Sequence, residues 1–328
     1  MRRIIDRPFR GLAVLVLAVG VAPLLATTKP ATAPTEPALT ESASVPGQAL
    51  SIVRAHRYRM AGRIRPLLFW IGRDEVGFAR IVWRADEMGG RAFEFLVGTD
   101  PAVAPRRLNR WGYIAEQHLG RDGTLLAVMA RSDEQSVGEV EARVGEGRRT
   151  GDFQAIRGVV RGGQATWQVA PVHTSSDLTI HQVGTLLRQV ESDTAAATRH
   201  HASLGPAVRP GFLTAVAEIV DRTTAMWHVD GSARDGWGSP VPYVFGQRQF
   251  EVRVRSFALV ASPRRELTGG ARVADVAFEI RTIATGERTR FEMVYPLEGV
   301  LAGVPLRIRW QPRWWLQVEL QLDEDARG

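Results

Sequence analysis

The chain has 328 residues and no cysteine, which excludes disulfides and cysteine-ligated zinc or iron–sulfur sites. Its 42 lysine and arginine residues outnumber the 35 aspartate and glutamate residues, and Lys29 is the single lysine. Because the basic residues are dispersed along the chain, the net charge of +7 does not indicate a nucleic-acid partner.

The first 26 residues place a basic segment, MRRIIDRPFR, before the apolar run GLAVLVLAVGVAPLL, and Ala26 follows this run. A positive flank, a short hydrophobic stretch and a small residue at the cut are typical of a secretory signal peptide. An uncleaved anchor is the alternative, although a spanning helix needs about 20 apolar residues. We therefore predict a signal peptide over 1–26 and export to the periplasm or the cell exterior, with no other attachment to the membrane.

Residues 27–48 are rich in Pro, Thr and Ala and have no apolar periodicity, so they are predicted to form a disordered tether. Residues 49–172 contain short segments in which apolar and polar residues alternate between turn signals. In one of them Phe93, Phe95 and Val97 share a face. This pattern predicts an N-terminal β-rich region of antiparallel strands.

Two glycine-containing pairs in this region indicate tight hairpin turns. Asp122-Gly123 and Gly162-Gly163 each separate two alternating segments. Such pairs supply the positive φ angles that a type I′ turn requires. We expect the chain to reverse at both pairs.

Residues 173–226 change to helical periodicity. A first helix is predicted from apolar residues spaced three or four apart, namely Ile180, Val183, Leu187 and Val190. Thr174 and Asp177 have the spacing of a capping box at its start. A second helix is predicted to begin at Pro210, because proline is tolerated at the first helical position. The stretch 194–208 between them is interpreted as a partly irregular linker.

Residues 227–328 return to alternation, with chain reversals expected at Thr285-Gly286 and Gln311-Pro312. This region is predicted to be a C-terminal antiparallel meander. The whole chain is therefore assigned to the α+β class, with a mainly antiparallel curved sheet that is half-barrel or sandwich-like and a central two-helix segment.

The segment VPLRIRWQPRWWLQVEL contains three tryptophans interleaved with arginines. Strand alternation puts Trp310 and Trp314 on the apolar face and Trp315 on the polar face. One interpretation is that all three tryptophans fill the end of the core. The other is that Trp315, Arg309 and Arg313 form a rim for an anionic or sugar-like ligand, because arginine stacks on tryptophan and binds anions bidentately.

A second candidate site is the segment RRLNRWGYIAEQH, in which Arg110 and Trp111 could line the mouth of a groove. The alternative is a surface loop that its aromatic residues anchor. Both interpretations leave open what would bind there.

His173, Asp177 and His181 form the most suggestive polar group in the chain. Two imidazoles and a carboxylate are a plausible zinc or iron ligand set. The alternative is a solvated carboxylate at a helix start with histidines nearby. No metal or other cofactor is expected, and the sequence contains no HExxH motif, serine-hydrolase elbow or phosphate-binding loop.

The layout of an exported chain with curled antiparallel strands is similar to periplasmic half-barrel proteins that handle lipids or lipoproteins, at the level of architecture alone. The first functional hypothesis is a non-enzymatic envelope protein that binds a lipid, an amphipathic or anionic small ligand, or an envelope partner protein. The second is a secreted hydrolase with a histidine and carboxylate site. The third is a scaffolding module. Whether the protein is an enzyme stays open at this point.

Overall fold

The structure, a computed structural model, describes residues 50–64, 71–120, 122–130, 153–172, 178–192, 198–230, 238–313 and 316–323. The predicted signal peptide and tether lie outside the described residues.

Most of the described chain forms one antiparallel sheet, and the helices are few, so the prediction of a mainly antiparallel architecture is confirmed. Its strands are β1 (Ser51–Ile64), β2 (Ile71–Ala85), β3 (Arg91–Thr99), β4 (Trp111–Leu119), β5 (Asp122–Ala130), β6 (Phe153–Arg161), β7 (Gln164–Val172), β8 (Thr198–Ser203), β9 (Val241–Phe245), β10 (Arg248–Val260), β11 (Val273–Thr282), β12 (Arg288–Pro296), β13 (Arg307–Arg313) and β14 (Leu316–Leu322).

The order of the strands in the sheet is β8-β7-β6-β5-β4-β3-β2-β1-β14-β13-β12-β11-β10-β9. Strands that follow one another in the chain are therefore neighbours, except that β1 pairs with β14 in the middle. Two half-sheets result, an N-terminal one (β1–β8) and a C-terminal one (β9–β14). The β1–β14 ladder joins them through backbone hydrogen bonds.

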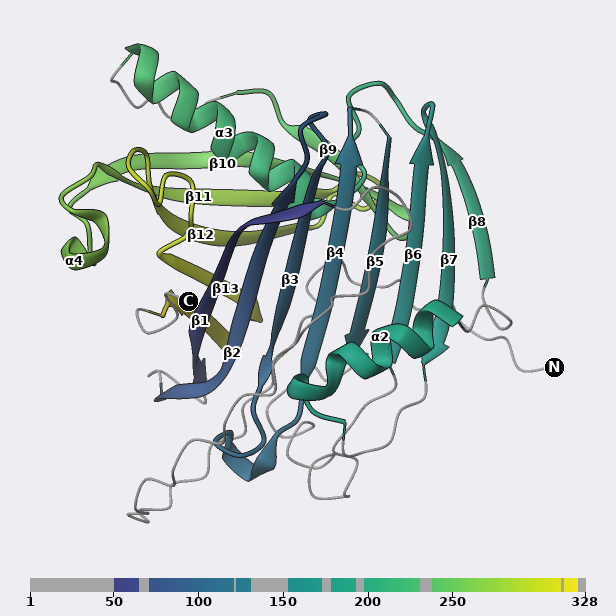
Figure 1. Cartoon of the computed structure of the whole chain (residues 1–328), viewed down its shortest axis with the longest axis horizontal. Helices are drawn as coiled ribbons and strands as arrows, with labels where there is room; N and C mark the ends of the chain where they lie inside the picture. Colours follow the sequence, from purple (N-terminus) through teal and green to yellow (C-terminus); the bar gives the residue numbers. More distant parts are fainter. Residues whose placement is uncertain are drawn as a thin grey trace.

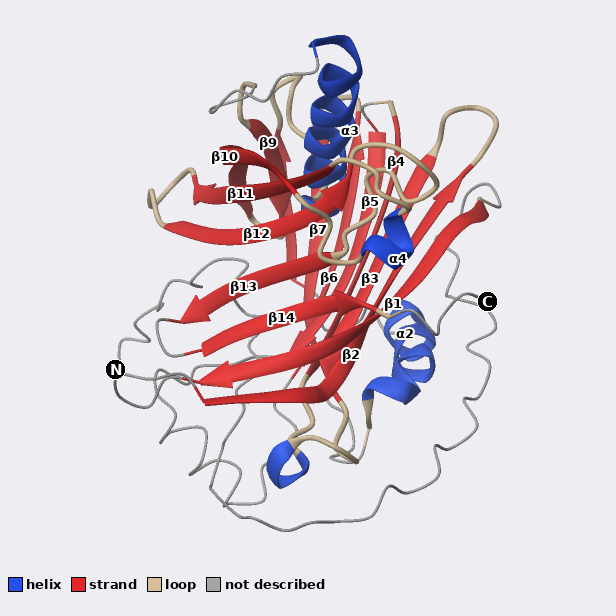
Figure 2. Ribbon diagram, turned by 90° about the vertical axis from the view of Figure 1, so that its left-hand side faces the viewer, coloured by secondary structure: helices blue, strands red, loops and turns tan. Residues whose placement is uncertain are grey.

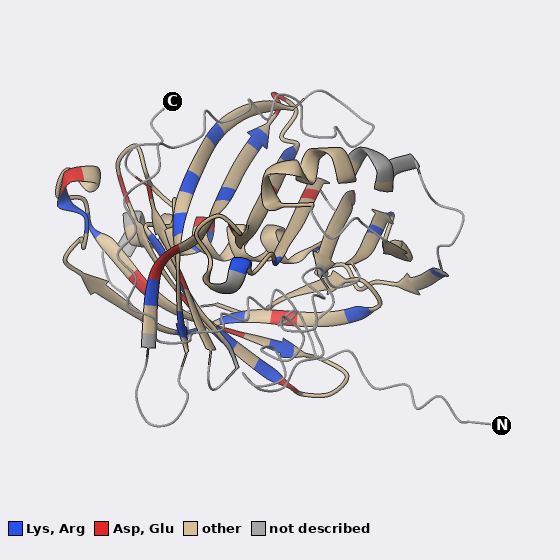
Figure 3. Cartoon of the chain, turned by 90° about the horizontal axis from the view of Figure 1, so that it is seen from below, with Lys and Arg blue, Asp and Glu red and all other residues tan. Residues whose placement is uncertain are grey.

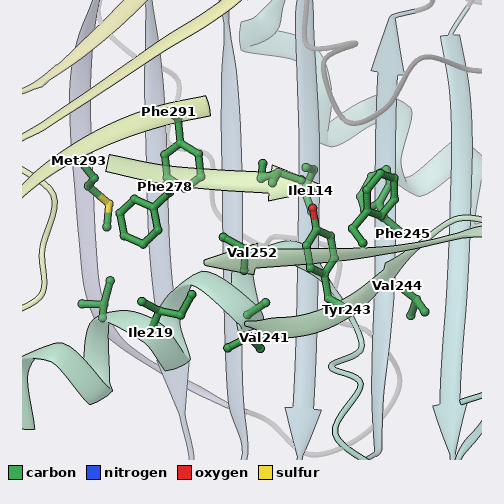
Figure 4. Packing of buried hydrophobic residues seen from close by; sticks show 14 of the residues in the cluster. Ile114, Ile219, Val241, Tyr243, Val244, Phe245, Val252, Phe278, Phe291 and Met293 are labelled. Carbon is green, nitrogen blue, oxygen red and sulfur yellow. The ribbon is translucent and has the colours of Figure 1, made fainter. Parts of the chain in front are cut away.

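The sheet bends so that the two half-sheets cross and face each other (Figures 1 and 2). The largest apolar cluster lies between them and contains residues from β4–β7 and from β9–β12. Figure 4 shows Ile114 of β4 and Ile219 of helix α3 among side chains from β9 to β12. Within this cluster Phe278 and Phe291 stack with their ring centroids 4.7 Å apart. Burial of these apolar faces is what drives the bend.

Two helices cover the N-terminal half-sheet from opposite sides. Helix α2 (Val183–Ser192), preceded by the 3₁₀ turn η3 (Ile180–Gln182), packs on strands β3–β6 on the face away from the C-terminal half-sheet. Helix α3 (Phe212–Asp230) packs between the half-sheets. Short helical turns occur at η2 (Pro105–Arg107) and α4 (Arg265–Thr268). Among the described residues, no helix has the length and apolar character needed to span a membrane.

The apolar stripe predicted for the first helix is confirmed, and the second predicted helix is present, beginning at Phe212 and not at Pro210. All four residues of the first stripe are buried against the sheet, namely Ile180, Val183, Leu187 and Val190. A capping box is present at Thr179 and Gln182, whereas Thr174 and Asp177 lie outside the described residues. The predicted linker between the helices contains strand β8, because the edge of β7 offers free backbone groups with which Thr198–Ser203 pairs.

Two predicted turns are displaced. The β4–β5 reversal lies between Leu119 and Asp122, which pair, so Asp122 begins a strand and Gly120 carries the positive φ of 61°. Strand β13 runs through Pro312 to Arg313, which pairs with Leu316. The register shifts between Trp310 and Arg313, and such an irregularity accommodates a proline without ending the strand. The turns at Gly162-Gly163 and Gly286 are confirmed.

Candidate ligand-binding cavity

A cavity of about 490 Å³ lies between the two half-sheets. This volume falls within the roughly 300–1,000 Å³ of small-molecule sites. Its lining is predominantly apolar and comes from strands β1–β5 and β11–β14, from the loop before β13, and from helix α3. Residues that are more than 200 positions apart therefore face the same space, as Val53 and Leu320 do.

Aromatic side chains form a large part of the cavity wall. On the N-terminal half-sheet, Trp83 and Phe93 occupy directly paired positions of β2 and β3, and Phe95 is next on the same face of β3. On the C-terminal half-sheet, Phe291 and Trp310 are paired positions of β12 and β13. Aromatic walls favour apolar ligand groups and give them a large contact area.

Helix α3 closes one side of the cavity. Phe212, Val216 and Val220 are spaced four apart along the helix and line the cavity together. Farther along the helix, the hydroxyl groups of Thr223 and Tyr295 form a buried hydrogen bond of 2.6 Å, which ties α3 to β12. The position of α3 therefore sets the width of the cavity.

The N-terminus of α3 is held by a buried carboxylate on β4. The backbone amides of Leu213 and Thr214 donate hydrogen bonds to the two Glu116 oxygens at 2.9 and 2.7 Å. Burial raises the pKa of Glu116 to about 7, although these amide hydrogen bonds favour the ionised form. Gly211 permits this close approach, because a Cβ atom there would lie 2.2 Å from Glu116 Cδ.

Charged groups among the lining residues are partly exposed. Arg91 Nη1 and Asp221 Oδ2 are 2.6 Å apart, and these side chains are 51% and 58% exposed. Arg54 is exposed, and its Nη1 atom donates a 2.8 Å hydrogen bond to the carbonyl oxygen of Ala302. We call Arg54, Arg91 and Asp221 the rim. A polar group of a ligand could meet guanidinium donors there while its apolar part stays in the cavity.

The predicted ligand residues of the tryptophan hairpin have separate locations. Trp310 lines the cavity, whereas Arg309 is on the opposite face of β13, where it contacts Glu292 and Glu319 at 3.2 Å each. Strand alternation predicted this division. The side chain of Arg313 and the whole of Trp314 and Trp315 lie outside the residues described.

Arg110 and Trp111 are 5% and 3% exposed and do not belong to the cavity lining. Trp111 stacks on Phe153 with a centroid distance of 4.4 Å, and its Nε1 atom donates to the carbonyl oxygen of Leu178 just before η3. This environment is the packing of the α2 side of the sheet. The described contacts of Trp111 are therefore internal to the protein.

Of the three candidate metal ligands, His181 alone is among the described residues. Its Nε2 atom lies 3.2 Å from Asp100 Oδ2, and its ring contacts Phe78 at a centroid distance of 5.2 Å. The described part of the chain contains no cluster of three or more residues suited to hold a metal ion. His173 and Asp177 lie outside the described residues, so the hydrolase hypothesis stays a prediction.

The sequence analysis identified part of the cavity wall without identifying the cavity. The prediction that Phe93, Phe95 and Val97 share a face is confirmed, and this face lines the cavity. Nothing in the sequence indicated that Trp83 and Met293 line a cavity, because alternation does not distinguish side chains in a filled core from side chains around a cavity.

The crystal structure of a β-barrel-like protein of domain of unknown function DUF1849 from Brucella abortus is similar to this chain. The match has 9% sequence identity and a TM-score of 0.46, and covers 84% of this chain and 98% of that chain. No protein-family model and no curated protein matches the chain. What the cavity binds therefore has to be inferred from its own residues.

Proposed function

We propose that this chain is an exported, non-enzymatic protein that binds a hydrophobic or amphipathic small molecule between its two half-sheets. The observation that carries the proposal is the apolar cavity of about 490 Å³ closed by α3. A cavity lined by apolar side chains offers a ligand's hydrocarbon groups an environment out of water, and each buried CH₂ group contributes about 0.8 kcal/mol. Export is supported by the composition of residues 1–26.

The arrangement of polar groups supports an amphipathic ligand. Apart from the rim, the polar side chains of the described lining are Arg84, which is paired with Glu94, and Thr289, so the interior offers little compensation for a buried polar group. A ligand with one polar end satisfies both regions when that end lies beside Arg54 or Arg91. We infer that the apolar end of the ligand enters first and packs against the aromatic wall.

A substitution that fills the cavity tests this proposal. Ala217 of α3 lines the cavity, and Ala217→Trp should lower the affinity for the fluorescent probe N-phenyl-1-naphthylamine by at least about tenfold, because the indole occupies the ligand volume. The matched control is Met226→Trp on the same helix, where the native side chain is 40% exposed and does not line the cavity. Probe titration of both variants, with circular dichroism to verify folding, provides the measurement. Equal probe affinity in the two folded variants would contradict a cavity site.

Export has its own test. When the full chain is expressed with its N-terminal segment, intact-mass measurement of the protein recovered outside the cytoplasm should show a chain that begins after Ala26. Recovery of only the uncleaved chain from the cytoplasm would contradict the export part of the proposal and leave the cavity part unaffected.

A further inference from the structure

Four arginines converge on one carboxylate on the outer face of the C-terminal half-sheet. Glu279 of β11 is paired across the strands with Arg253 of β10 and with Arg290 of β12. Arg253 donates two hydrogen bonds to Glu279 Oε1. The guanidinium nitrogens of Arg288 and Arg290 lie 3.7 Å from the carboxylate, and that of Arg255 lies 3.9 Å from it.

The positive charge of this group exceeds its negative charge. Arg281 extends the group and contacts Glu251 at 3.3 Å, so this group holds five arginines and two carboxylates. We call these seven residues the arginine face. Two further carboxylates on the same face, Glu292 and Asp275, are paired with arginines of β13. Figure 3 shows where basic and acidic residues lie on the strands of the two half-sheets. The Glu279 side chain is fully buried beneath the arginines, whereas Arg288 and Arg290 are 52% and 69% exposed. Their unneutralised charge is therefore directed to solvent.

An exposed apolar residue lies at the end of the same two strands. Ile283 follows β11 directly and is 44% exposed, in the turn that connects Arg281 to Arg288. Figure 2 shows the β11–β12 hairpin extending away from the body of the protein. Arg281 and Arg288 flank this turn, which also carries the exposed Glu287. Arginines beside an exposed apolar residue are a combination by which peripheral proteins bind anionic bilayers, since the cations meet headgroup phosphates and the apolar residue enters the interface.

We propose that the arginine face and Ile283 form a docking surface for an anionic lipid bilayer. The choice of a lipid surface rests on the proposed function, because an amphipathic ligand has to be taken from, or delivered to, a lipid phase. The opposite face of the same strands lines the cavity: Ile280 and Thr289 face the cavity, and Thr289 stands between Arg288 and Arg290 in the chain. Docking would thus hold the cavity wall against the bilayer.

Vesicle binding by the full mature chain tests the docking surface. The double variant Arg288→Glu, Arg290→Glu should bind vesicles of phosphatidylglycerol and phosphatidylcholine at least about tenfold more weakly than the unmodified protein, since two attractions to anionic headgroups are replaced by repulsion. The matched control is Arg161→Glu, Arg199→Glu, which makes the same change in net charge with exposed residues of β6 and β8. Equal losses in the two double variants would show a general charge effect and overturn the proposal.

Two further measurements separate a bilayer from a free anion and separate this proposal from the cavity. Ile283→Ser should weaken vesicle binding severalfold and leave the affinity for inorganic phosphate unchanged, because phosphate has no apolar part. Unchanged vesicle binding in this variant, or vesicle binding that phosphate abolishes by competition at constant ionic strength, would overturn the bilayer assignment. Ala217→Trp should still bind vesicles, and the Arg288 and Arg290 double variant should still bind the hydrophobic probe. Loss of vesicle binding alone would therefore be assigned to the arginine face, and loss of probe binding alone to the cavity.

Discussion

Glu116 is buried on β4, and its carboxylate accepts the amide hydrogens of Leu213 and Thr214 at the start of α3. These contacts satisfy backbone donors that the helix itself cannot pair. The cost is a buried carboxylate, whose desolvation raises the pKa to about 7. The folded protein therefore retains this proton to a higher pH than the unfolded chain does.

The stability of the protein should depend on pH through this residue. Because the folded-state pKa is raised, the contribution of Glu116 to the free energy of unfolding is full below about pH 4.5 and is lost as the pH rises through about 7. The loss should be on the order of 1–3 kcal/mol. Glu116→Gln removes the titration, so this part of the pH dependence should vanish. Urea unfolding between pH 4.5 and 8 measures it, and parallel curves for the two proteins would exclude a titrating Glu116.

Helix α3 is the element on which the cavity depends, and its attachment requires a close backbone approach at its first turn. The helix contributes Phe212, Val216 and Val220 to the lining. Its N-terminus can reach Glu116 because Gly211 has no side chain. By contrast, α2 packs on the opposite face of the sheet, and none of its described side chains lines the cavity.

Alanine substitutions at Gly211, directly before α3, and at Gly184, within α2, should change the free energy of unfolding in opposite directions. Gly211→Ala places a methyl group within 2.5 Å of the Glu116 carboxylate atoms and should lower the free energy of unfolding by about 1–3 kcal/mol. Gly184→Ala in α2 meets nothing within 4 Å and should raise it by about 0.4–1 kcal/mol, because alanine restricts the unfolded chain. Thermal and urea unfolding report both changes. A neutral Gly211→Ala would mean that α3 can shift without cost.

At the scale of the whole molecule, the β1–β14 ladder makes one sheet out of two meanders. Val318 of β14 pairs with Gly62 on one side and with Trp310 on the other, and it lines the cavity. Because β14 has a neighbouring strand on each side, its backbone N–H groups are used in hydrogen bonds to those strands. The facing of the two half-sheets, and with it the cavity, depends on this junction.

Val318→Pro should break the junction. Proline removes a ladder donor in a central strand, so the variant should be less stable than Val318→Ala by about 2 kcal/mol or more. The alanine variant has the same backbone and is the control for the lost side chain. Urea unfolding should show the difference, and hydrogen exchange should show lost protection in both β1 and β14. Similar stability of the two variants would mean that the ladder contributes little.

Local patterns in the sequence predicted most of the strands, their inward rows and the two main helices, but not β8, which lies in the stretch interpreted as a linker. The row of Phe93, Phe95 and Val97 and the opposite facing of Arg309 and Trp310 follow from the two-residue period of a strand, which needs no knowledge of the fold. The same reasoning misplaced the turn at Asp122-Gly123 and the one at Pro312, because the register of a hairpin depends on which partners pair and not on the turn residues alone.

Tertiary structure alone decided the pairing of β1 with β14, the capping of α3 and the existence of a cavity. Glu116 is 97 positions from Leu213 in the chain, so no local pattern links the carboxylate to the helix that it caps. The arginine face likewise forms only when β10, β11 and β12 lie side by side. Alternation in the sequence predicts which side chains are buried. Whether those side chains fill a core or enclose a cavity depends on the distance between the two half-sheets, which the tertiary structure sets.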